Sequence, residues 1–229
     1  MRSLLNYFSK FEICLWLFSV IFIISSFFIF DSSAPISLVA SLIGVTALIF
    51  CAKGNPIGQI LIIIFGLIYG YISFSYSYYG EMVTYVGMSV PMAILSLISW
   101  VRNPYKKNRV EVKIRQIDKK DLFIILLLAS LVTFVFYFIL KYFGTANLLT
   151  STLSVATSFI AVCFTFLRSP FFALAYAIND LVLIALWFMA TLNDISYLSV
   201  IICFAVFFIN DMYSFYSWTK MKKRQQRGE

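Results

Sequence analysis

Residues 170–190 read PFFALAYAINDLVLIALWFMA, and residues 195–218 read ISYLSVIICFAVFFINDMYSFYSW. Each stretch is long and apolar enough to cross a membrane as a helix, because about 20 residues span a hydrocarbon core of roughly 30 Å. Each nevertheless carries an Asn-Asp pair in its interior, Asn179-Asp180 in the first and Asn210-Asp211 in the second. A carboxylate at the centre of a spanning helix costs roughly 2.5–3.5 kcal/mol on insertion scales. We therefore interpret the two pairs as a polar site within the bilayer, typical of a transporter.

The composition of the whole chain is that of an integral membrane protein. Its 229 residues are 62% hydrophobic and 12% charged, with a mean hydropathy of +0.92, whereas soluble domains carry about 25% charged residues. Strand-type alternation is absent, which argues against a barrel. The apolar runs predict an all-α fold with eight transmembrane helices, at about 12–30, 36–52, 56–79, 82–100, 121–143, 148–167, 170–190 and 195–218.

The distribution of basic residues predicts the topology. If the N-terminus is cytoplasmic, only Lys141 among the 18 Lys and Arg residues falls on the outer side of the membrane. The outer loops would instead carry Asp31, Glu81 and Asp194. By the positive-inside rule, both termini are expected in the cytoplasm. The same rule explains the net charge of +8 without a nucleic-acid partner.

The chain also contains an internal repeat. Residues 36–100 and 148–218 each hold three spans, of which the second begins at a proline (Pro56, Pro170) and the third ends at a tryptophan (Trp100, Trp218). One linker span between them gives both units the same orientation, so we predict a 3+1+3 parallel-repeat core, SWEET-like, with one extra N-terminal helix. The predicted segments are the extra helix (1–31), the first repeat (32–100), a basic cytoplasmic loop (101–120), the linker helix (121–145), the second repeat (146–218) and a basic cytoplasmic tail (219–229).

The first span has a second interpretation as a cleaved signal peptide. Arg2 and Lys10 precede its apolar run, and Ser32-Ser33-Ala34 follow it. Its run of about 18 residues exceeds the usual length of about 7–15 for such a region. We therefore favour a retained membrane span.

Counting from the membrane surface places the two Asn-Asp pairs at one depth. Asn179 lies nine residues after Pro170, and Asn210 lies eight residues before Trp218. At 1.5 Å per residue both are about 12–13 Å from the same surface, near the midplane where transporter substrates bind. No Lys or Arg lies within these spans, so Asp180 and Asp211 must be protonated, hydrogen-bonded or matched by a cationic ligand. An interhelical hydrogen-bond clamp and a substrate cavity are both compatible with this pattern.

Further residues are candidates for the same site, each with a structural alternative. Trp187 lies on roughly the same helical face as Asn179 and could stack on a planar ring or belong to the interfacial belt. Gln59 and Tyr85 could hydrogen-bond a ligand or simply pack inside the bundle. Glu81 is expected as a solvated acid at a helix start.

Other features of the sequence have a structural interpretation. Gly66 and Gly70 form a GxxxG element that predicts a close helix contact, and Pro91 is expected to kink the fourth span. Trp100 and Trp218 are expected in the interfacial belt. The charged run at 102–120 is expected to be a solvated loop.

The composition argues against an enzyme. The chain contains no histidine, and its four cysteines are scattered one per apolar run, which suggests neither a disulfide framework nor a metal site. We expect no catalytic residue, no metal and no cofactor.

Four stretches resemble the PnuC-type nicotinamide riboside transporters, of the variety found in Gram-positive bacteria. They are YGEMVTYVGM at 79–88, RSPFFALAY at 168–176, NDLVLIALW at 179–187 and FINDMY at 208–213. The resemblance covers roughly residues 35–218 and implies a homotrimer in the inner (plasma) membrane. It also implies facilitated diffusion of nicotinamide riboside, trapped inside by a cytoplasmic riboside kinase.

The resemblance maps the family's midplane asparagines onto Asn179 and Asn210. The sequence departs from other branches at Leu183, where they have a Trp, so the ligand contacts are expected to differ in detail. Nicotinamide riboside is a planar pyridinium cation, which suits a cavity with carboxylates, amides and aromatic faces. Thiamine, riboflavin and, with the same fold, a sugar remain alternative substrates.

Overall fold

The computed structural model describes residues 7–31, 35–75, 78–106, 111–192 and 194–228. Within these ranges the chain is helical, and its β pairing is limited to an isolated bridge between Pro104 and Val112. In this described part of the chain, eight helical segments are long and apolar enough to cross a membrane. The predicted all-α fold with eight spans is therefore confirmed. The segment Ser32-Ser33-Ala34, on which the signal-peptide interpretation depends, lies outside the described residues.

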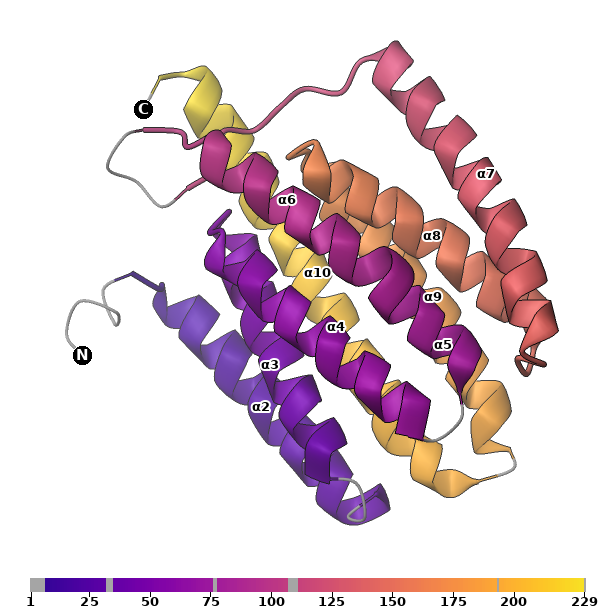
Figure 1. The fold of residues 1–229 in the computed structure, drawn as a ribbon. Helices are drawn as coiled ribbons and strands as arrows, with labels where there is room; N and C mark the ends of the chain where they lie inside the picture. Colours follow the sequence, from indigo (N-terminus) through magenta and orange to yellow (C-terminus); the bar gives the residue numbers. More distant parts are fainter. Residues whose placement is uncertain (1–6, 32–34, 76–77, 107–110, 193, 229) are drawn as a thin grey trace.

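The eight spans follow one another along the chain and lie side by side (Figure 1). Six are single helices: α2 (Lys10–Phe30), α3 (Pro35–Ala52), α4 (Ile57–Ser75), α7 (Lys119–Tyr142), α8 (Leu148–Phe166) and α9 (Phe171–Thr191). The fourth span consists of α5 (Tyr79–Val83), the π-helix η1 (Thr84–Ser89) and α6 (Val90–Arg102). The eighth consists of the 3-10 helix η2 (Ile195–Tyr197) and α10 (Leu198–Gln226).

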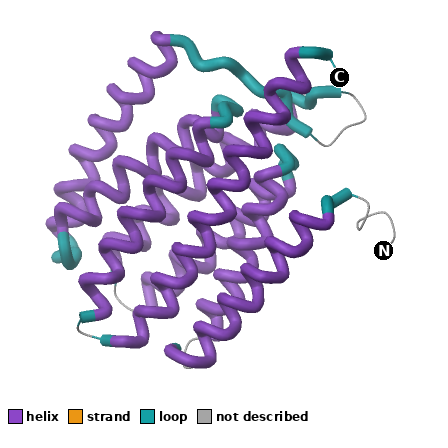
Figure 2. The backbone as a smooth tube through the Cα atoms, turned by 180° about the vertical axis from the view of Figure 1, so that it is seen from behind, coloured by secondary structure: helices purple, strands orange, loops and turns teal. Residues whose placement is uncertain are grey.

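The described loops are confined to the two ends of the bundle (Figure 2). The start of α2 and the end of α10 lie at the same end, which we call the termini end; the opposite end is the far end. The helices α3, α4 and α6 pack together as one group, and α8, α9 and α10 as a second. The groups meet along α3–α10 and α6–α8, while α2 covers α3 and α10. In the sequence, the single span α7 separates the two groups, so corresponding helices of both groups cross the membrane in the same direction.

Local sequence explains where two long helices begin. The Ser9 hydroxyl accepts a hydrogen bond from the Glu12 backbone N–H, and the Glu12 carboxylate accepts one from the Ser9 N–H. Asp118 and Asp121 form the same reciprocal box at the start of α7. Each box satisfies two backbone donors that a helix start leaves unpaired, and such a cap is worth about 1 kcal/mol.

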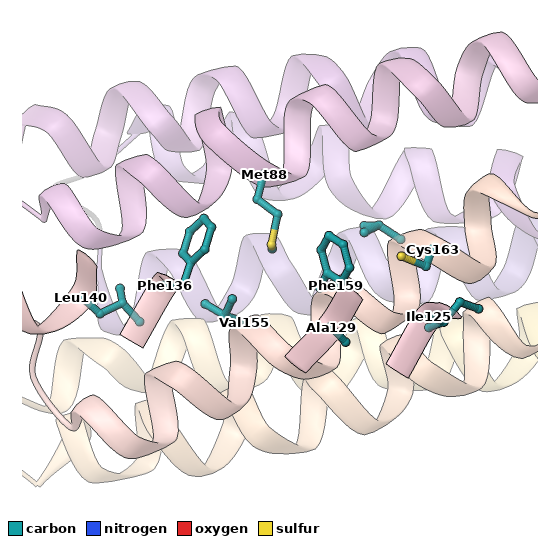
Figure 3. Packing of buried hydrophobic residues seen from close by; sticks show 9 residues of the cluster. Met88, Ile125, Ala129, Phe136, Leu140, Val155, Phe159 and Cys163 are labelled. Carbon is teal, nitrogen blue, oxygen red and sulfur yellow. The ribbon is translucent and has the colours of Figure 1, made fainter. Parts of the chain in front are cut away.

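A cluster of buried apolar side chains holds α7 against the bundle (Figure 3). Met88 reaches into it from η1, between the side chains of α7 and α8. Lipid tails are as apolar as these residues, so close van der Waals packing rather than the hydrophobic effect stabilises this contact. The labelled members are Met88, Ile125, Ala129, Phe136, Leu140, Val155, Phe159 and Cys163.

The sequence predicted a kink at Pro91, and in the structure a π-helical turn, Thr84–Ser89, directly precedes the helix that contains this proline. Proline has no N–H and its ring clashes with the preceding turn. The chain accommodates it with a π-helical turn, in which the Val90 N–H donates to the Tyr85 carbonyl five residues earlier. Such wide turns are frequent at functional sites, and Tyr85 belongs to this one.

The GxxxG element makes the close helix contact that the sequence predicted. A Cβ atom added to Gly66 would lie 2.8 Å from the Val90 side chain, and one added to Gly70 would lie 2.4 Å from that of Val86. These distances are too short for real carbon atoms, so only glycine lets α4 approach the fourth span this closely.

The loop after α6 is not simply solvated, which corrects the expectation for 102–120. Within its described part, Val112 is buried and its N–H donates to the Gly54 carbonyl, 3.0 Å away. Gln225 and Arg224 of α10 bind the same segment through Glu111. The tail joins this contact because α10 continues as a helix to Gln226 instead of ending at Trp218.

Candidate functional site

A cavity of about 200 Å³ lies between the two helix groups. Residues of both groups line it, from α3, α4 and the fourth span on one side and from α8, α9 and α10 on the other. A space of this size holds many water molecules, since one needs roughly 10–15 Å³. Six of the seven residues predicted for the site line the cavity: Gln59, Tyr85, Asn179, Asp180, Trp187 and Asp211.

Two carboxyl groups from adjacent helices meet in this cavity. Asp180 of α9 and Asp211 of α10 are 4% and 2% exposed, and their side chains lie within hydrogen-bonding contact of each other. Asp180 Oδ2 and Asp211 Oδ1 are buried without a hydrogen-bond donor among the described residues. No Lys or Arg occurs among the described residues that line the cavity. The two carboxyl groups therefore have no basic partner among the described residues of the cavity lining.

Asn179 presents an amide to the cavity. Its Oδ1 accepts a hydrogen bond from the Thr157 hydroxyl of α8, 2.8 Å away. That bond fixes the orientation of the amide and leaves its Nδ2 group as a donor toward the cavity.

Asn210 is the one predicted site residue that the structure places elsewhere. Its Nδ2 donates to the Ser19 hydroxyl of α2 at 2.9 Å and to the Val206 carbonyl at 2.8 Å, and the residue is 1% exposed. Consecutive helix residues point about 100° apart, so with Asp211 in the cavity Asn210 faces α2. It clamps α10 to α2 and does not line the cavity.

Aromatic rings form one wall of the cavity. The rings of Tyr69 and Tyr85 have centroids 5.2 Å apart, and Phe65 packs on Tyr69 at 4.7 Å. Gln59 completes the wall and donates from Nε2 to the Cys51 sulfur at 3.5 Å. Such faces suit a flat ligand, especially a cation.

The sequence analysis missed several cavity residues. Phe65, Tyr69 and Tyr176 line the cavity but have no distinguishing signal in a chain with 25 Phe and 14 Tyr. The α8 serines could have been found, because Ser151, Ser154 and Ser158 recur at helical spacing on one face.

A second cavity, of about 290 Å³, opens at the far end. It shares Tyr69, Glu81 and Trp187 with the central cavity, so the two adjoin. Its lining includes Asp31, Glu81 and Asp194, the three acids that the sequence placed on the outer side. Glu81 is partly buried, not simply solvated, which corrects its expected role. A cation reaching the central cavity from this end meets acidic side chains along the way.

The termini end of the cavity is closed by two tryptophans. Trp100 and Trp218 are 1% and 0% exposed, so their interpretation as interfacial belt residues is wrong. Their rings pack with Phe172, whose centroid lies 4.8 Å from that of Trp218. This aromatic cluster borders the cavity at its termini end, where Phe172 is also a lining residue.

Hydrogen bonds tie this closure across the two helix groups. The Trp100 indole N–H donates to the Thr165 carbonyl at 2.9 Å, and the Ser99 hydroxyl to that of Phe166 at 2.8 Å. In the other direction, Trp218 donates to the Cys51 carbonyl and Ser217 to that of Ala52, each at 2.8 Å. We call these two contacts the Ser-Trp clasps. Each joins the last helix of one group to the end of the first helix of the other.

Comparison with known proteins agrees with this architecture. Residues 34–220 match the model of the family described as "Nicotinamide mononucleotide transporter". The chain is 23% identical over 227 residues to the nicotinamide riboside transporter PnuC of Neisseria mucosa, covering 97% of this chain and 86% of that protein. Its fold matches the crystal structure of the vitamin B3 transporter PnuC with a TM-score of 0.80 at 21% identity, over 95% of this chain and 94% of that one. The chain therefore belongs to the nicotinamide mononucleotide transporter family of multi-pass membrane transporters.

Proposed function

We propose that this transporter takes up nicotinamide riboside by facilitated diffusion through the central cavity. The observation that carries the proposal is the unbalanced acidity of that cavity, where Asp180 and Asp211 face aromatic rings without a Lys or Arg among the described lining residues. Nicotinamide riboside combines a planar pyridinium cation with a polar ribose. Carboxylates attract the cation, aromatic faces stack on it, and the Asn179 amide can bind a ribose hydroxyl.

The acidity also favours the riboside over the mononucleotide. A phosphate group requires Arg, Lys or converging backbone N–H groups, and the described lining offers no basic side chain. The relative from Neisseria mucosa, named for the riboside, supports the same choice.

We propose that the termini end faces the cytoplasm. The distribution of Lys and Arg along the chain supports this orientation. The far-end cavity would then receive substrate from outside, and the Ser-Trp clasps would close the cytoplasmic exit. Rocking of the two groups around the cavity would give alternating access.

The proposal includes the partners implied by the family resemblance. The proposed assembly is a homotrimer. A cytoplasmic riboside kinase would phosphorylate the transported riboside and so trap it inside. The transporter itself would then need no enzymatic activity. The absence of histidine from the sequence supports the last point.

Uptake of radiolabelled nicotinamide riboside into proteoliposomes tests the function. We expect flux of the riboside and little flux of nicotinamide mononucleotide or glucose. Thiamine, a second planar cation, and riboflavin, a neutral ring, test whether charge or shape selects the ligand. Flux of glucose or riboflavin without flux of the riboside would contradict the proposal.

A further inference from the structure

The Asp180–Asp211 pair lacks the basic partner that three other acids among the described residues have. Glu12, Glu111 and Asp121 each form an ion pair with Lys or Arg, whereas Asp180 and Asp211 contact each other. Each also has one buried oxygen without a partner. A third polar atom of the cavity, the Ser96 hydroxyl oxygen, is buried and unpartnered as well. These unpartnered oxygen atoms are free to bind a ligand in the cavity.

Two carboxyl groups in contact cannot both carry a charge without a compensating cation. Like charges at such a distance force one group to keep its proton, which then bridges the two oxygens. No basic residue is present among the described lining to relieve this repulsion. The pair therefore holds at least one proton when the cavity contains only water.

The groups around the pair do not supply the missing proton or charge. Helix α2, on the other face of α10, contributes Glu12, which is engaged by Lys53 and Tyr213. The cavity acid Glu81 lies toward the far end. The titratable side chains that interact electrostatically with Asp180 or Asp211 are weak acids, neutral in ordinary conditions: Cys51 of α3, Tyr85 of η1, Tyr176 of α9 and Cys203 of α10.

We propose that Asp180 and Asp211 form a proton-binding site whose shared proton is exchanged for the cationic ligand. When the cation enters, the O–H bond of the protonated carboxyl breaks and the proton passes to cavity water; when the cation leaves, the pair takes a proton back from cavity water. Starting from a single shared proton, the pair changes from one negative charge to two, and the ligand adds one positive charge, so the net charge of the cavity is unchanged. The identity of the ligand rests on the proposed function; the proton site rests on the contact between the two carboxyls.

This exchange makes binding depend on pH in a defined direction. Protons compete with the cation for the pair, so affinity falls at low pH and rises as pH increases. With one proton exchanged per ligand, the rise is at most about tenfold per pH unit. The affinity for a neutral ligand of the same shape should not depend on pH in this way.

The test measures protons released when nicotinamide riboside binds to purified protein in weakly buffered detergent solution. We expect about one proton per bound ligand in the unmodified protein, and none in Asp180→Asn or Asp211→Asn. In these variants the new amide donates to the remaining carboxylate and replaces the shared proton. Glu12→Gln is the matched control: it removes a buried acid that contacts α10 outside the cavity, and release per bound ligand is expected to persist. Reduced nicotinamide riboside, the uncharged form, is expected to release no proton.

Binding of the riboside without proton release would overturn the proposal. If the riboside does not bind, the proposed function fails instead, and infrared spectroscopy of the ligand-free protein then decides the proton site. A protonated-carboxyl band that disappears in both Asp→Asn variants supports the site, and its absence from the unmodified protein overturns it. Because the infrared measurement on the unmodified protein needs no variant, a misfolded variant does not prevent the decision.

Discussion

The indole rings of Trp100 and Trp218 lie 5.3 Å apart at the termini end of the bundle, and each donates its N–H to a backbone carbonyl of the other helix group. The two residues end corresponding helices, α6 and α10, and each follows a serine that makes a parallel hydrogen bond. The repeated Ser-Trp dipeptide is therefore a repeated contact. If the groups rock apart, these four hydrogen bonds must break together.

Removing one indole donor is expected to loosen this closure. Trp218→Phe keeps an aromatic ring beside Phe172 but removes one of two donors to the Cys51 carbonyl, which retains the Gly54 N–H, at a cost of about 0.5–1.5 kcal/mol. The open state should therefore be enriched by roughly two- to tenfold. Alkylation of the Cys51 thiol, in protein lacking the other three cysteines, measures this opening.

Trp16→Phe is the matched control for the clasp. It removes an indole donor to the Thr46 hydroxyl at 3.1 Å, between α2 and α3 and outside the clasps. Cys51 should react at its original rate in this variant. Equal rates in Trp16→Phe and Trp218→Phe would show that the clasp does not hold the closed state.

The two asparagines are expected to separate binding from stability. Asn179→Leu removes the amide that lines the cavity. A ribose hydroxyl left without its partner costs about 1–3 kcal/mol, which corresponds to roughly 5- to 150-fold weaker riboside binding. Asn210→Leu leaves the cavity intact but breaks the clamp to Ser19. It should lower the thermal stability in detergent and leave the dissociation constant nearly unchanged. Comparable losses of affinity in the two variants would contradict this assignment.

The different positions of these asparagines show what the sequence can and cannot predict. Spacing from Pro170 and Trp218 fixed their depth, because the rise per residue of a helix is constant. It could not fix the rotation of α10, which depends on packing against α2 and α3. Helix α10 is rotated so that Asp211, and not Asn210, lines the cavity beside Asp180 of α9.

Hydrogen bonds from side chains to backbone carbonyls could not be predicted from the sequence either. The acceptors of Trp100 and Trp218 are carbonyl groups, which every residue possesses, so no side-chain pattern marks them. The docked segment at Val112 is a similar case, since its partners are Gly54 and the end of α10. The spans and their polar interruptions, by contrast, followed from hydropathy alone, because a bilayer tolerates few structures.

Arg168 is expected to show opposing contributions to stability. It has a φ of 57°, a left-handed conformation that the first repeat supplies with Gly54, at 65°. Its guanidinium also binds the Ser99 hydroxyl at 2.5 Å and the Lys113 carbonyl at 3.2 Å. Arg168→Ala and Arg168→Gly lose these contacts equally, but only glycine removes the strain, so the Gly variant should be more stable by about 1 kcal/mol. Thermal unfolding in detergent compares them; a more stable Ala variant would contradict the strain.

The acids of the far-end cavity are expected to speed the capture of a cation. The backbone N–H of Ser196 holds the pKa of Asp194 below its ordinary value, so this carboxylate stays ionised at neutral pH. In the double variant Asp31→Asn and Asp194→Asn, the new amide at 194 can still cap η2, and two negative charges are lost. Initial uptake of dilute nicotinamide riboside should fall roughly three- to tenfold at low salt. The difference should vanish near 1 M salt, where the screening length is about 3 Å. Uptake of the uncharged reduced riboside should be the same in both proteins at every salt concentration. A loss of uptake that persists at high salt, or that also affects the neutral ligand, would mean that these residues act through structure and not through charge.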